Sequence, residues 1–78
     1  MKTIEVDEMV NQAKYWVKCS RKCMTLSARR VYIDMALGTV AILSYIEINR
    51  KYSIGVYDKG RFKYYDECYK KYYEMIFE

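Results

Sequence analysis

The sequence predicts an α+β fold of the order (β)ααβββα, and three observations support this prediction. Apolar residues recur at helical spacing up to residue 37, with positive charges opposite them. Residues 39–57 are instead rich in β-branched and aromatic types that alternate along the chain. Helical spacing then returns after Asp66. At 78 residues we expect a single compact domain, residues 1–78, with a helix layer against one small sheet.

The first predicted helix begins at Asp7, a residue type that caps helices, with Glu8 placed favourably in the first turn. Its apolar stripe contains Met9, Ala13, Trp16, Val17 and Met24. Residues 1–6 could add a short edge strand ahead of this helix.

A second helix is predicted from Thr25, the expected N-cap, to Leu37. Gly38 would end it, because glycine readily takes the left-handed conformation that commonly follows a helix. Neither proline nor glycine interrupts residues 7–37, so a single bent helix stays open as an alternative.

A three-stranded antiparallel meander is predicted to follow. Its strands are residues 39–48, 52–57 and 61–65, and the first turn is residues 49–51. The second turn, residues 58–60, has the sequence Asp-Lys-Gly, in which the glycine suits the positive φ of a three-residue hairpin loop. Asp66 and Glu67 then open a last helix, whose lysines face glutamates four residues away.

One uncharged, mostly apolar stretch, residues 35–46, is twelve residues long. A transmembrane helix needs roughly 18–20 such residues, so we expect no membrane span. Residues 1–5 also lack the apolar core of a secretion signal, which favours the cytoplasm. In that reducing compartment the three cysteines, Cys19, Cys23 and Cys68, are expected to be small hydrophobic residues.

The composition argues against an enzyme. Histidine is absent, which removes the usual general base and the commonest metal ligand. The three glycines are scattered, so no glycine-rich phosphate loop exists. Three cysteines fall short of the four ligands of structural zinc, and adding Asp66 would be arbitrary. We therefore expect no catalysis, no cofactor and no metal.

The strongest functional indication is a segment without acidic residues. Between Glu8 and Asp34 the chain has six positive charges and no negative one. Four of them lie within roughly 100° of one another on the first helix, and we call these the basic stripe: Lys14, Lys18, Arg21 and Lys22. Two more, which we call the junction arginines, extend it: Arg29 and Arg30.

A second group of candidate binding residues is Arg61, Lys63 and Tyr64, which interleave cations with a ring as single-stranded nucleic-acid binders do. The alternative for both groups is structural. The basic stripe would then be an ordinary solvated helix face, and Tyr64 would pack in the core.

The layout also resembles a known class of protein. The features are the helix start Thr25-Leu26-Ser27-Ala28-Arg29-Arg30, the sheet entry Gly38-Thr39-Val40 and the hairpin Tyr57-Asp58-Lys59-Gly60-Arg61. In these it resembles small phage-encoded inhibitors, particularly some anti-CRISPR proteins, over about residues 25–65. The resemblance implies a stoichiometric inhibitor in the cytoplasm of a bacterial host. Its partner would be a host protein or ribonucleoprotein complex of a defence system.

Two functions therefore follow from the sequence. The first is a non-enzymatic inhibitor that binds a host complex through tyrosines and arginines, the residue types enriched in interface hot spots. The alternative is a protein that binds DNA or RNA directly and without sequence preference through the basic stripe. A homodimer formed through a tyrosine-rich face stays open in both.

Overall fold

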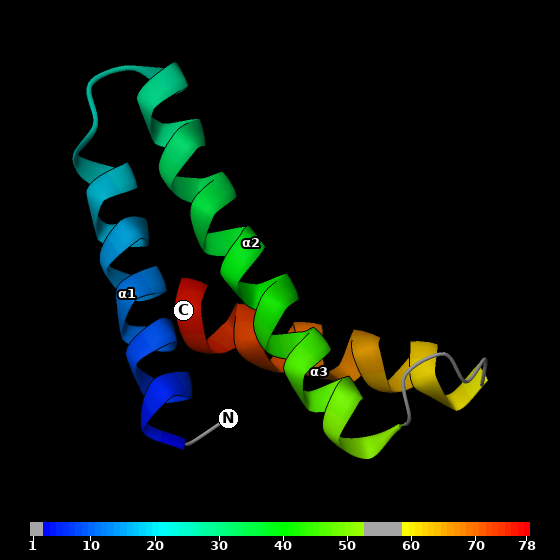
Figure 1. The fold of residues 1–78 in the computed structure, drawn as a ribbon. Helices are drawn as coiled ribbons and strands as arrows, with labels where there is room; N and C mark the ends of the chain where they lie inside the picture. The colour runs from blue at the N-terminus through cyan, green and yellow to red at the C-terminus, as the bar shows by residue number, and fades with distance from the viewer. Residues whose placement is uncertain (1–2, 53–58) are drawn as a thin grey trace.

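The computed structural model describes residues 3–52 and 59–78, and within them the only regular secondary structure is helical. The helices are α1 (Thr3–Lys22), α2 (Leu26–Lys51) and α3 (Lys59–Phe77). Figure 1 shows α1 and α2 as an antiparallel hairpin, with α3 crossing its lower half and ending beside α1. The prediction of an α+β domain with a three-stranded meander is wrong, since no described residue lies in a strand. The fold is all-α.

Helix α1 begins at Thr3, four residues before the predicted cap Asp7, so residues 3–6 are helical and not an edge strand. Its buried face is formed by Val10, Ala13, Val17 and Ser20. These positions repeat every three or four residues, as an amphipathic helix requires. Trp16 packs at the edge of the core.

The connection between α1 and α2 confirms two helices and the cap at Thr25. Thr25 has an extended backbone (φ −114°, ψ 151°), and its side chain accepts a hydrogen bond from the Ala28 amide at 3.2 Å. Arg29 donates from Nε to the Cys23 carbonyl at 3.1 Å. Met24, predicted to lie in the apolar stripe, is 97% exposed in this connection.

Helix α2 contains the whole of the predicted first strand and continues through Gly38. Apolar residues lie on all sides of this helix, so its sequence fits both the two-residue period of a strand and the 3.6-residue period of a helix. Packing against α1 and α3 decides in favour of the helix. Its inner side buries Ala36, Val40, Leu43 and Ile48. Burying one such side chain contributes about 1.5–3 kcal/mol, while β-branched residues cost a helix at most about 0.7 kcal/mol each.

Helix α3 begins at Lys59, seven residues before the predicted start. The predicted third strand, residues 61–65, is therefore helical, and the predicted hairpin turn is wrong from Lys59 onward. Tyr52, at the start of the predicted second strand, has an extended backbone, and residues 53–57 lie outside the described residues. Asp58 also lies outside them.

The core lies where all three helices meet. It contains Val10, Ala13 and Val17 of α1, Ala36, Val40 and Leu43 of α2, and Tyr72 and Ile76 of α3. The molecule measures 44 × 25 × 19 Å, and the end of the hairpin near Thr25 extends beyond the cover of α3. That end is therefore a thin, two-helix projection with its side chains largely in solvent.

The length and composition of α2 would allow it to cross a membrane. The helix has 26 residues, and an 18-residue window within it has a mean hydropathy of 1.6. The uncharged stretch considered from the sequence, residues 35–46, has only twelve residues, which are too few to span a bilayer. One third of that window (33%) is buried inside the molecule. The core helix of a soluble protein meets the same criteria.

Candidate functional site

The basic stripe lies on the solvent side of α1, along the border of the buried face that contacts α2 and α3. All four of its residues are exposed. None of them has a carboxylate within 4.0 Å in residues 3–52 and 59–78. Their charges are therefore not neutralised by ion pairs with the described part of the chain.

A small hollow lies beside the basic stripe, where the end of α3 approaches α1. Its volume is about 180 Å³, and it is lined by Lys14, Val17, Lys18, Arg21, Met75, Ile76 and Glu78. Three of the four cations of the stripe thus border a shallow surface with an apolar floor. A flexible anionic group could lie along it, with Glu78 the one acidic side chain of the lining.

The junction arginines lie in the first turn of α2, and both are exposed. Arg29 is held by its hydrogen bond to the Cys23 carbonyl, which orients its guanidinium beside the end of α1. Arg30 has no ion pair with a described residue. The structure therefore brings the junction arginines to the same end of the hairpin as Arg21 and Lys22.

The second group of candidate residues is elsewhere. Arg61, Lys63 and Tyr64 lie in the first turns of α3, at the end of that helix remote from α1 (Figure 1). The Tyr64 ring lies under Lys51, whose Nζ is 4.2 Å from the ring centroid. The structure does not join these residues to the basic stripe, and Tyr64 packs between helices.

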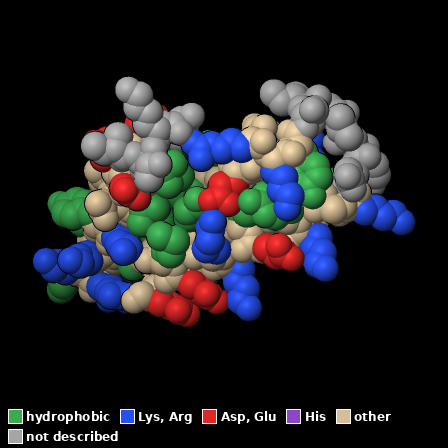
Figure 2. Space-filling model, turned by 90° about the horizontal axis from the view of Figure 1, so that it is seen from below, with side chains coloured by type: hydrophobic (Ala, Val, Ile, Leu, Met, Phe, Trp, Pro, Cys, Tyr) green, Lys and Arg blue, Asp and Glu red, His purple; other side chains and the backbone are tan. Residues whose placement is uncertain are grey.

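Charge is mixed on other parts of the surface. The face drawn in Figure 2 shows acidic side chains among lysines and arginines around an apolar centre. The absence of acidic residues is therefore a property of the segment between Glu8 and Asp34, and Glu78 comes close to its surface from the other end of the chain.

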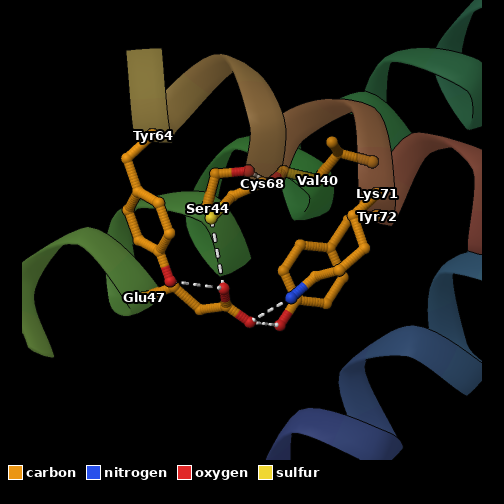
Figure 3. Close-up of polar contacts among 7 residues, drawn as sticks. All are labelled: Val40, Ser44, Glu47, Tyr64, Cys68, Lys71 and Tyr72. Atoms are coloured by element: carbon orange, nitrogen blue, oxygen red, sulfur yellow. Dashed lines mark hydrogen bonds and ion pairs between the residues drawn. The ribbon is translucent and has the colours of Figure 1, made fainter. Parts of the chain in front are cut away.

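The most connected polar group is one that sequence reasoning missed, and we call it the Glu47 cluster (Figure 3). Glu47 projects from α2 and accepts hydrogen bonds from four side chains of α3. The donors are Lys71 Nζ at 2.7 Å, Cys68 Sγ at 3.1 Å, Tyr64 Oη at 3.5 Å and the Tyr72 hydroxyl. The only signal in the sequence was a glutamate directly after the apolar run of residues 35–46, since a carboxylate needs partners if it is buried.

These contacts determine the protonation states in the cluster. Burial alone would raise the pKa of Glu47, but the hydrogen bonds from Lys71, Tyr72 and Cys68 outweigh it and lower the pKa to about 2. Burial and the Glu47 carboxylate both raise the pKa of the Cys68 thiol. A thiol that stays protonated is a poor nucleophile, so the arrangement suits a structural clamp between α2 and α3.

The other thiols do not form a metal site within the described residues. No group of three or more Cys, Asp or Glu side chains there could hold a metal ion. Cys19 and Cys23 lie one turn apart on α1, and the Cys23 thiol donates to the Cys19 carbonyl at 3.2 Å. All three cysteines are free, with Cys68 buried and the other two half-buried.

Comparison with known proteins adds no relative. No protein-family model matches the chain, and neither the curated proteins nor the solved structures contain a significant match. Fold and site together define only a class of protein: a small helical protein with three helices among its described residues and a local basic surface that forms no ion pair within them. Its function has to be inferred from that surface.

Proposed function

We propose that this chain is a small, non-enzymatic protein that binds the phosphate backbone of nucleic acid through the basic stripe. One observation supports the proposal above all. Four cations stand exposed on one side of a packed helix, and none pairs with a carboxylate among the described residues. Such cations break no ion pair within the protein when they bind phosphates, and the counterions released from the nucleic acid favour binding.

The geometry of α1 suits a phosphate backbone. Lys14, Lys18 and Arg21 are separated by about one helical turn each, which is about 5 Å along the axis. The packed core fixes the helix, so the cations approach a strand together. Such contacts give affinity without reading the bases, and the affinity falls steeply with salt.

The test is fluorescence anisotropy of labelled single- and double-stranded DNA and RNA over a salt series. We compare Lys14→Gln/Lys18→Gln with a matched control, Lys59→Gln/Lys70→Gln, which removes two exposed lysines of α3. For duplex DNA the test variant should reduce the slope of log K against log salt by roughly 2, and the control by much less. Absence of binding at low salt, or equal losses in both variants, would contradict the proposal.

A second candidate is the inhibitor of a host complex, and one observation favours it. Met24 and Leu26 are 97% and 80% exposed beside the junction arginines. A phosphate backbone offers nothing to such apolar side chains, whereas a protein surface does. The resemblance that suggested an inhibitor loses its sheet entry, which lies inside α2, and retains the helix start at Thr25.

The inhibitor is tested by affinity capture from bacterial lysate, performed with and without nuclease treatment. A stoichiometric partner that is captured by the wild type and lost with Met24→Ser/Leu26→Ser would support it. Capture that survives this change but disappears after nuclease treatment would favour nucleic acid instead.

A further inference from the structure

The side of α2 opposite its buried face is apolar, and we call it the outer stripe: Val31, Met35, Gly38, Ile42 and Tyr45. Val31, Met35, Ile42 and Tyr45 are 58%, 40%, 53% and 54% exposed. Gly38 is exposed too, and a Cβ added there would meet nothing within 4 Å. The Tyr45 ring also contacts Tyr65 of α3, with ring centroids 5.3 Å apart.

The spacing of the outer stripe is that of a helix-pairing seam. Its members follow one another at intervals of four, three, four and three residues, the pattern of a coiled-coil contact line. A helix that is apolar on all sides is normally covered on all sides. Among the described residues, α1 and α3 cover the inner side of α2, and α3 also reaches the outer stripe through the ring contact of Tyr65 with Tyr45.

We propose that the outer stripe is the contact between two copies of this chain, which pair α2 against α2 in antiparallel orientation. The two-fold axis passes near Gly38, because the stripe is nearly symmetric about it. Val31 and Tyr45 lie seven residues to either side, and Met35 and Ile42 lie three and four away. Each copy therefore presents the same surface to the other, as an isologous dimer requires.

Gly38 and the charges are compatible with this arrangement. A glycine at the axis lets the two helices approach closely, because neither places a side chain between them. Asp34 borders the outer stripe, and the two-fold places it beside the partner's Ile42. The two Asp34 carboxylates are then about 12 Å apart along the helix axis, so like charges do not face each other.

The exposed area is of the right order for a dimer. The four large side chains are about half exposed. Since each has a total surface of roughly 200 Å², together they expose about 400 Å² per copy. A standard interface takes about 800 Å² per partner, and polar side chains at its rim contribute the remainder. A patch of about 400 Å² is comparable with the largest apolar patch of a typical monomer, and such patches are often functional.

A lipid bilayer is a less suitable occupant of the same surface. One third of the most apolar part of α2 is buried within the molecule, so lipid could surround the helix only if the core separated. Asp34 beside the stripe and Glu47 on the inner side would also be costly inside a bilayer.

The test is sedimentation velocity of the full chain from roughly 1 μM to 1 mM, with two matched variants. Gly38→Glu places like charges at the axis, while the open space around Gly38 leaves the monomer intact. Gln12→Glu makes the same charge change on exposed α1. We expect a wild-type dimer, unchanged by Gln12→Glu and weakened at least about 100-fold by Gly38→Glu. Circular dichroism verifies that Gly38→Glu stays helical.

The register is tested by oxidative cross-linking of Gly38→Cys, with the wild type as baseline for the native thiols. Rapid formation of a covalent dimer through position 38 supports the two-fold at Gly38. A wild type that is monomeric at every concentration overturns the proposal, as does one that remains monomeric and binds neutral lipid vesicles. Both results are independent of nucleic-acid binding, because the basic stripe lies on α1.

Discussion

At the scale of single residues, the Glu47 carboxylate controls how firmly α3 is held against α2. Its pKa is about 2 in the folded protein, against an ordinary value of 4.5. A group whose pKa is lowered by folding adds stability above its unfolded pKa, and the contribution disappears as the pH falls through the folded value. The cluster should therefore stabilise the fold fully above about pH 4.5 and progressively less toward pH 2.

We predict that Glu47→Gln lowers the free energy of unfolding by about 1–3 kcal/mol at neutral pH, because four donors lose a charged acceptor. Urea denaturation of the variant and the wild type at several pH values measures the difference, which should shrink toward pH 2. Glu74→Gln is the control, since it removes an exposed carboxylate of α3 and should change stability by less than about 0.5 kcal/mol. A difference that stays constant with pH would contradict the role given to Glu47.

The Glu47 cluster also shows where sequence reasoning stops. The sequence pairs Lys71 with Glu67 four residues earlier, yet the structure pairs it with Glu47, on another helix, at 2.7 Å. Local spacing reveals contacts within one helix. A contact across 24 residues depends on how α2 and α3 pack, and no pattern within a single helix contains that information.

At the scale of elements, Thr25 separates α1 from α2. Its side chain satisfies the Ala28 amide, one of the four amides at a helix start that have no partner within the helix. We predict that Thr25→Ala costs about 1 kcal/mol of stability, measured by chemical denaturation. Ser27→Ala, an exposed hydroxyl two residues later, should change stability by no more than a few tenths of a kcal/mol. Equal losses of stability in Thr25→Ala and Ser27→Ala would show that the loss in Thr25→Ala does not come from the missing cap.

The elements divide into those that local chemistry determines and those that packing determines. Thr25 was predicted correctly because a cap depends on three neighbouring residues. Gly38 was predicted to end a helix and instead continues it, because both flanking turns are buried on their inner side. In residues 39–48, apolar types at nearly every position left the period undecided, and contact with α1 and α3 selected the helix.

At the scale of the whole molecule, stability depends on one thin core. Two neighbouring residues of α2 test this, because Leu43 is 1% exposed and Ile42 is 53% exposed. We predict that Leu43→Ala costs about 2–5 kcal/mol, a large part of the total for a domain of this size. Ile42→Ala should cost less than about 1 kcal/mol in thermal or urea unfolding of dilute, monomeric protein. Similar losses at both positions would contradict the packing of α2.

The sequence predicted the positions of candidate site residues correctly only on the first helix, where it also predicted the secondary structure correctly. Helical periodicity placed Lys14 and Lys18 outside the apolar stripe of the first helix, and the structure has both side chains exposed. Arg61 and Lys63 were placed on a strand, and their position at the far end of α3 required the correct fold. The proposed binding surface can thus be predicted from the sequence only where the local secondary structure can be predicted too.

The position of Trp16 has a practical consequence for optical experiments. It is the only tryptophan among ten tyrosines, and it packs at the edge of the core on α1. Energy transfer to its indole from excited tyrosines of α3 should be greater while α3 lies across the hairpin, above a constant contribution from neighbours such as Tyr15. Excitation of tyrosine with detection at tryptophan wavelengths therefore provides a label-free readout of helix docking in the unmodified chain.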